Sequence, residues 1–235
     1  MSTMRRWMSF IFLSLATAVI CYGQPRIAEA ELMFLSRHVW RGEQLGTAVS
    51  IEPSVTATAG RFSFNVWAAL TPDNSYSEVD LIPSYQFDYF ELSLLDYYNP
   101  VAGEKNRYLK FDDVANRHSV EVTLDNYEVE KYRLKWMAGT FIFGDKNEDT
   151  GKPYYSTYIE FSYPFTLWKI DMEPSAGFTP ARGYYADHFA FVSTAVSFGK
   201  EIEFNGPFTI PLTLSLIHNP STSNTFVTFA TGIAF

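Results

Sequence analysis

The stretch Thr225-Phe226-Val227-Thr228-Phe229-Ala230-Thr231-Gly232-Ile233-Ala234-Phe235, which ends the chain, decides the fold class. Successive side chains of a β-strand point to opposite faces, so Val227, Phe229, Ile233 and Phe235 share one face. An alternation of period two over this length predicts a half-buried strand and does not fit a helix. The chain therefore closes on a strand whose one face is apolar and whose last residue is aromatic.

The same alternation recurs through most of the chain. In residues 48–59 the apolar positions Val49, Ile51 and Val55 alternate with Ser, Glu and Thr, and residues 61–70 and 118–127 behave alike. Each segment is about ten residues long, the length that a tilted strand needs to cross a bilayer. Twelve strands are predicted, at about 27–40, 48–59, 61–70, 76–87, 90–98, 118–127, 132–142, 154–164, 166–178, 188–199, 207–217 and 225–235.

The connections between these segments also alternate, in length. Tight links are predicted at Gly60–Arg61, Asp88–Tyr89 and Pro164–Phe165, whereas links such as 99–117 and 144–153 are long and polar. Short turns at one end and long loops at the other are typical of outer-membrane barrels. We expect an all-β fold, an antiparallel transmembrane up-and-down β-barrel of about 12 strands, with both termini at the short-turn, periplasmic end. The alternative is a secreted sandwich or lipocalin-like barrel, which has the opposite orientation of faces.

Composition and charge agree with a strand-rich, exported protein. Of the 235 residues, 17 % are aromatic and only 19 % are charged, a mixture that suits pleated sheets. The formal net charge is −8, and the chain has no basic cluster, so it is a poor nucleic-acid binder. Its single cysteine, Cys21, permits neither an internal disulfide nor a thiolate zinc site. We expect no metal and no cofactor.

Residues 1–23 have the features of a secretory signal peptide. Arg5 and Arg6 precede an apolar stretch that runs from about Trp7 to Ile20, and small residues follow. The stretch is shorter than the roughly 18 residues that a transmembrane helix requires. In a lipoprotein, Cys21 would become the new terminus, but Ile20 before it fits such a site poorly. We expect residues 24–235 to form the barrel in the outer membrane of a Gram-negative bacterium.

Two motifs carry resemblances. Ser36-Arg37-His38-Val39-Trp40-Arg41-Gly42 resembles the Ser-x-x-x-x-Arg-Gly first strand of the TorF family of outer-membrane porins, and Tyr76-Ser77-Glu78-Val79-Asp80-Leu81 resembles that family's acidic strand. His38-Val39-Trp40 replaces the more usual Tyr-aliphatic-Phe sequence, and the resemblance covers mainly residues 32–98. It implies a porin fold and location. The terminal Phe235 resembles the signal that the outer-membrane assembly machinery reads, which implies that machinery and outer-membrane lipid as partners.

The polar faces of the strands are strongly charged. If the apolar faces meet lipid, the lumen receives eleven acids and five bases, namely Glu29, Glu31, Arg37, Glu52, Arg61, Glu78, Asp80, Glu91, Glu121, Asp125, Arg133, Lys135, Glu160, Lys169, Asp171 and Glu173. So many charges must be hydrated or paired. A water-filled pore would hydrate these charges, and its net negative field would attract cations. Such a pore would pass small polar or cationic solutes.

Two other functions remain open from the sequence. A salt-bridged lumen would make the barrel a closed scaffold, such as an adhesin, a receptor or a structural protein. A lipid-modifying enzyme would use Ser and His at the rim, and all four histidines fall near the long-loop ends of their strands. However, His118 and Ser119 are adjacent and point to opposite faces, and the chain contains neither Gly-x-Ser-x-Gly nor His-Glu-x-x-His. We therefore expect no enzyme.

Overall fold

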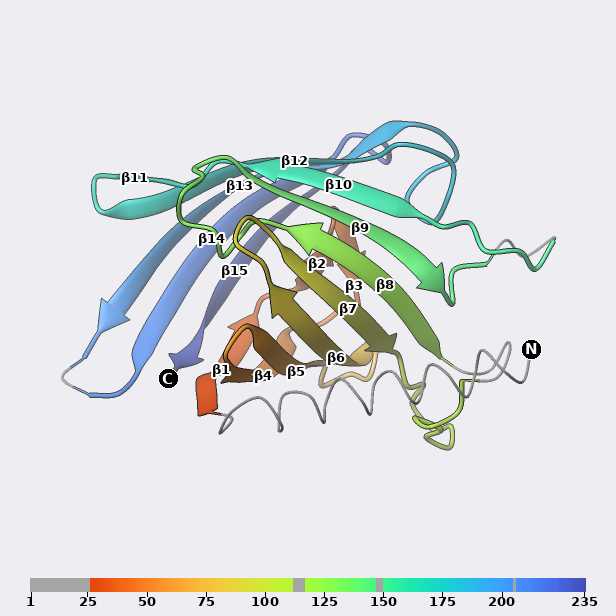
Figure 1. The fold of residues 1–235 in the computed structure, drawn as a ribbon, viewed down its shortest axis with the longest axis horizontal. Coiled ribbons are helices and arrows are strands. Elements are labelled where there is room, and N and C mark those ends of the chain that lie inside the picture. The colour runs from red at the N-terminus through yellow and green to blue at the C-terminus, as the bar shows by residue number, and fades with distance from the viewer. Residues whose placement is uncertain (1–25, 112–116, 147–149, 205) are drawn as a thin grey trace.

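The computed structural model describes residues 26–111, 117–146, 150–204 and 206–235. The predicted signal peptide, residues 1–23, lies outside this part of the chain. The described part is all β-structure, and none of its segments is a helix long and apolar enough to cross a membrane. Neighbouring strands of the main sheet pair antiparallel. The strand β1 (Arg26–Leu35) pairs with β15 (Asn224–Ala234), and β10 (Thr157–Ser162) pairs with β12 (Ile170–Thr179), so the sheet closes on itself (Figure 1).

Twelve strands form the barrel wall, as the sequence predicts. Two short strands, β10 (Thr157–Ser162) and β11 (Phe165–Leu167), act as one interrupted strand because both pair with β12. The other wall strands are β1 (Arg26–Leu35), β4 (Ser50–Ala59), β5 (Phe62–Leu70), β6 (Ser77–Gln86), β7 (Glu91–Tyr98), β8 (His118–Asp125), β9 (Lys135–Phe143), β12 (Ile170–Thr179), β13 (Ala190–Glu203), β14 (Thr209–Asn219) and β15 (Asn224–Ala234).

Two predicted boundaries are wrong. The first strand does not run from 27 to 40, because β1 ends at Leu35 and the following residues form a separate hairpin, β2 (His38–Trp40) with β3 (Glu43–Leu45). The tight turn predicted at Pro164–Phe165 lies instead at Trp168 and Lys169, whose φ angles are 52° and 63°. Positive φ at both central residues gives the two-residue turn whose twist matches a hairpin.

The two faces of the wall differ in polarity. On β14 and β15, Leu214 and Phe229 pair across the strands on the outer face and are 47 % and 46 % exposed. Their neighbour Ser215 points inward, is only 8 % exposed and bonds Ser197 of β13 at 2.8 Å. The fully buried side chains of the described residues include many polar ones, such as Glu121. A water-soluble barrel has the reverse arrangement, with apolar residues inside.

The connection between β7 and β8 covers part of the outer wall. Asp96 and His118 alternate with the inward-facing Tyr97 and Ser119, so they point outward, yet both are almost fully buried. His118 Nδ1 lies 2.8 Å from Asp96 Oδ1, and His118 Nε2 lies 2.7 Å from the backbone oxygen of Tyr108. Residues 100–111 therefore pack as a strap over the outer face of β7 and β8.

Candidate functional site

The β2–β3 hairpin lies inside the barrel and narrows it. Its turn is Arg41-Gly42, with φ angles of 50° and 81°, and glycine adopts the second of these at no steric cost. A Cβ on Gly42 would overlap the backbone carbonyl oxygen of Val192 in β13, so only glycine allows this close approach. The side-chain amide of Asn219 in β14 donates to the carbonyl oxygen of Gly42 at 3.2 Å. The tip is thus held against the β13–β14 wall.

Arg41 fastens the hairpin to the opposite wall. Its two terminal nitrogens donate to the two carboxylate oxygens of Glu121 in β8, at 2.7 and 2.9 Å, and Tyr97 donates to the same carboxylate at 2.7 Å. The guanidinium also lies 4.5 Å from the ring centroid of Trp40 and 4.7 Å from that of Tyr158. A bidentate ion pair in which the guanidinium also stacks on aromatic rings requires arginine rather than lysine.

Space for this ion pair comes from the neighbouring strand. Gly139 of β9 lies opposite Thr123 of β8, and a Cβ there would collide with the Glu121 carboxylate. The Glu121 side chain therefore lies flat against β9, where water does not reach it, and its exposed fraction is 0 %. The anchor depends on residues from the hairpin and from four wall strands, β7, β8, β9 and β10.

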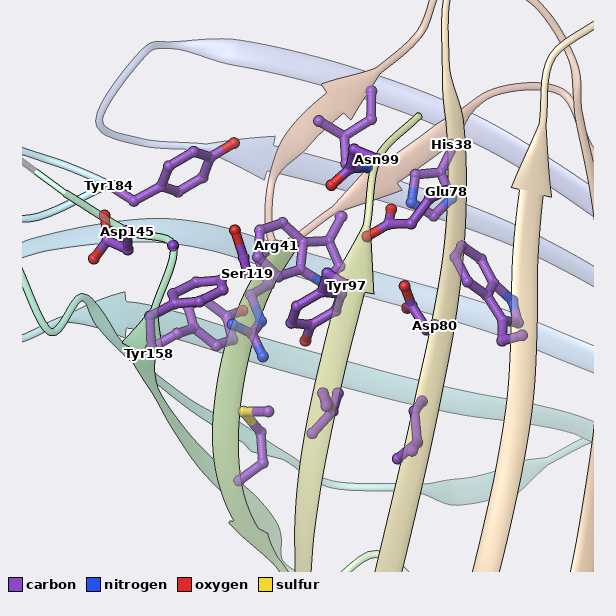
Figure 2. A pocket seen from close by; sticks show the side chains of 18 of the residues that line it. His38, Arg41, Glu78, Asp80, Tyr97, Asn99, Ser119, Asp145, Tyr158 and Tyr184 are labelled. Carbon is purple, nitrogen blue, oxygen red and sulfur yellow. The ribbon is translucent and has the colours of Figure 1, made fainter. Parts of the chain in front are cut away.

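A cavity of about 870 Å³ lies beside the hairpin. Its walls run from Ser119 and Tyr184 at the long-loop end to Tyr127, which follows β8 at the short-turn end. The hairpin supplies one side through His38, and the inner faces of β5 to β10 supply much of the rest. Figure 2 shows the lining side chains converging on this space from different strands. The hairpin therefore narrows the lumen, and the cavity lies between it and the inner faces of these strands.

One wall of the cavity is acidic and aromatic. Glu78 and Asp80 follow each other on the inner face of β6, and Asp80 pairs across the sheet with Trp67 of β5 and Tyr97 of β7. Tyr76 donates its hydroxyl to Glu78. The Oδ1 atom of Asp80 is buried and has no hydrogen-bond partner among the described residues.

His38 of the hairpin packs against the aromatic residues of this wall. Its Nδ1 is 2.8 Å from Glu52 Oε1 of β4, and its ring stacks on Tyr76 with centroids 5.6 Å apart. Trp67 lies 5.5 Å from the same ring. The histidine thus links the hairpin to the acidic wall, and its carboxylate partner is Glu52 rather than Glu78 or Asp80.

Most of the sequence-predicted lumen residues lie on inward-facing strand positions. The strand register places twelve of them on the face that lines the lumen: Glu29, Glu31, Glu52, Glu78, Asp80, Glu91, Glu121, Asp125, Lys135, Glu160, Asp171 and Glu173. Only some of these, including Glu78, Asp80 and Glu160, border the cavity itself. Lys135 is the one base among these twelve, and it donates to backbone carbonyls of the 126–129 turn.

The other four predicted lumen residues, all bases, lie outside the wall strands. Arg61 is in the β4–β5 turn and pairs with Asp88 of the next turn at 2.6 Å, with both side chains mostly exposed. Arg133 is exposed in the turn before β9, and Lys169 is in the β11–β12 turn. Arg37 precedes the hairpin and donates to Gln44 at 3.2 Å. The wall facing the lumen is therefore more acidic than the sequence alone predicts.

Sequence reasoning missed the residues that hold the hairpin. Arg41 belongs to the Ser36–Gly42 motif and follows the strand predicted at 27–40, but nothing in the motif predicts a contact with Glu121. Arg-Gly at a two-residue turn is a usable signal, since glycine favours positive φ there. Its partner lies 80 residues away in the chain, and no local pattern connects the two.

Comparison with known proteins adds no family. The chain matches no protein-family model and no curated protein. The TorF-like motif therefore stands alone as a sequence resemblance. Within the described residues, no group of three or more His, Cys, Asp or Glu side chains is arranged to hold a metal ion. The closed twelve-strand barrel fits an outer-membrane barrel protein in general, and the chemistry of the site follows from its own residues.

Proposed function

We propose that this protein is an outer-membrane channel of the TorF-like type, which lets small polar or cationic solutes pass through an acidic lumen narrowed by the β2–β3 hairpin. One observation carries the proposal, namely the combination of an apolar outer face with a cavity inside the barrel that lies beside the hairpin and is bordered by Glu78, Asp80 and Glu160. An apolar belt outside and polar residues inside suit a barrel whose solvent is lipid.

The charge of the lumen favours cations. The inward-facing acids greatly outnumber Lys135, and the carboxylate of Glu121 is already neutralised by Arg41. A narrow passage with low-dielectric walls and one sign of charge focuses the field and raises the local concentration of counter-ions. Rings of Asp and Glu are a known means of cation selectivity in channels. The N-terminal signal peptide and the terminal Phe235 are the proposed export and assembly signals.

Planar-bilayer recording of the purified, folded protein tests the proposal. We expect discrete conductance steps and, under a KCl gradient, a reversal potential of the sign that K⁺ selectivity gives. A matched pair of variants tests the origin of the selectivity. Glu78→Gln combined with Asp80→Asn should lower the preference for K⁺ over Cl⁻, whereas Asp88→Asn in an exposed turn should not.

A second candidate, a closed scaffold, is favoured by the docked hairpin itself. The ion pair between Arg41 and Glu121 and the contact at Gly42 hold it in place from two sides. Folded protein that inserts into the bilayer but gives no conductance would support this scaffold and refute the channel.

A further inference from the structure

We propose that the acidic and aromatic wall formed by Glu78, Asp80, Trp67, Tyr76 and Tyr97 is a binding subsite for the ammonium group of a small organic amine. The proposal names a solute class for the channel and so rests on the proposed function. The subsite would make the protein selective for one kind of cation rather than a general diffusion pore.

Asp80 has fewer partners than its burial requires, whereas Glu78 accepts a hydrogen bond from Tyr76. Glu78 and Asp80 are 6 % and 5 % exposed, and no Lys or Arg of the described residues forms an ion pair with either of them. Asp80 borders the cavity, and its Oδ1 atom is buried and has no hydrogen-bond partner among the described residues. A buried carboxylate oxygen without a donor is costly, and a cation that enters with its own N–H groups removes this cost.

The neighbours of Asp80 suit an alkylammonium ion. Residues directly opposite each other in antiparallel strands have Cβ atoms about 5 Å apart, so Trp67 and Tyr97 flank Asp80 on its two sides. Aromatic faces attract ammonium groups, and they also bury the methylene groups next to the charge. Figure 2 shows Asp80 and Glu78 directed into the same space as Tyr97.

The size of the cavity fits an organic solute rather than a bare ion. Its volume of about 870 Å³ lies in the range of pockets for small organic ligands, which are mostly apolar with a few converging polar groups. Leu95, Ile82 and Met137 supply apolar surface deeper in the cavity. A metal ion would need more oxygen or nitrogen ligands than this wall brings together.

Isothermal titration calorimetry of the folded full-length barrel in detergent tests the subsite, with putrescine as the probe and 1,4-butanediol as its neutral analogue. We expect saturable, one-to-one binding of putrescine and none of the diol. The double variant E78Q/D80N should weaken putrescine binding by about tenfold or more, which is the loss expected when a charge-assisted contact is removed.

The matched control is E29Q/E31Q, which removes two lumen acids that do not border the cavity. It should leave putrescine binding nearly unchanged. Equal loss in both double variants would mean that putrescine only joins a diffuse counter-ion cloud, and absence of saturable binding to the wild type would equally overturn the proposal. Both variants are checked for folding by their heat-modifiable mobility in gels, and D80N alone serves if the double variant does not fold.

The titration separates this inference from the channel itself, because binding needs no conductance. Conductance without putrescine binding refutes the subsite and leaves the channel standing. Putrescine binding without conductance refutes the channel and leaves the subsite. When both hold, putrescine added to one side of the bilayer should reduce the K⁺ current of the wild type and reduce it less in E78Q/D80N.

Discussion

Replacing Glu121 by glutamine is expected to release the hairpin from the lumen. The change keeps the size of the side chain but leaves the Arg41 guanidinium without its counter-ion, at a place where the two side chains are 8 % and 0 % exposed. Removing one partner of such a buried pair costs about 3–5 kcal/mol. Since about 1.4 kcal/mol corresponds to tenfold, the ratio of docked to undocked hairpin should fall by roughly a hundredfold or more.

Limited digestion with trypsin measures this ratio, because trypsin cleaves after Arg41 only when the hairpin leaves the wall. When docking and undocking are fast relative to cleavage, the rate follows the undocked population. The cleavage rate at Arg41 in folded Glu121→Gln should therefore rise by a similar factor. Single-channel conductance of the variant should also exceed that of the wild type, since the hairpin no longer narrows the passage.

Two further variants sharpen this experiment. Asp88→Asn makes the same change of charge at the exposed Arg61 pair, where such bridges contribute about 0–1 kcal/mol, and it should leave Arg41 protected. Gly42→Ala should expose Arg41 by another route, because its Cβ would overlap the Val192 carbonyl and its φ is 81°. If Arg41 is cleaved equally slowly in the wild type and in Glu121→Gln, the ion pair does not hold the hairpin and the reasoning fails.

Two other segments give testable expectations. Asp96→Asn should loosen the strap over β7 and β8 and speed proteolysis after Lys105, because His118 loses its carboxylate partner; an unchanged rate would show that the strap is held by other contacts. In the β5–β6 loop, hydrogen bonds from Ser75 and Thr47 lower the pKa of Asp73. The Asp73 carboxylate therefore stabilises the loop fully above the ordinary aspartate pKa of about 4. This stabilisation is lost as the pH falls through the lower pKa of the folded state. Hydrogen exchange at the Thr47 and Ser75 amides should thus be equally protected at pH 5 and 7 in the wild type but less protected in Asp73→Asn, and equal protection in both proteins would contradict the assignment.

The wall of the barrel was predictable because its physics is local. Alternation of apolar and polar residues reports which side chains share a face, and a register error of one residue would move all of them to the wrong face. Val227, Phe229 and Ile233 therefore lie together on the outer face of β15, and Ser215 lies on the inner face of β14. The number of strands followed from the same pattern.

The β2–β3 hairpin and one turn could not be predicted from the sequence, for physical reasons. Residues 36–40 fit a continuation of the first strand, and docking of the hairpin depends on Glu121 and Val192, which are distant in sequence. The tight link predicted at Pro164–Phe165 is instead an interruption between β10 and β11, where proline lacks the N–H that a continuous ladder needs. The true turn uses Trp168 and Lys169 at positive φ, where neither residue is favoured.

The central claim is that the apolar face of the wall meets lipid and the polar face meets water. Spin labels placed one at a time at positions 213 to 217 of β14, in protein reconstituted into liposomes, test it most directly through collisions with oxygen and with a water-soluble nickel chelate. We expect labels at Leu214 and Leu216 to favour oxygen and labels at Thr213, Ser215 and Ile217 to show the reverse, with a period of two. Equal access of the nickel chelate to both sets would contradict a membrane-spanning barrel.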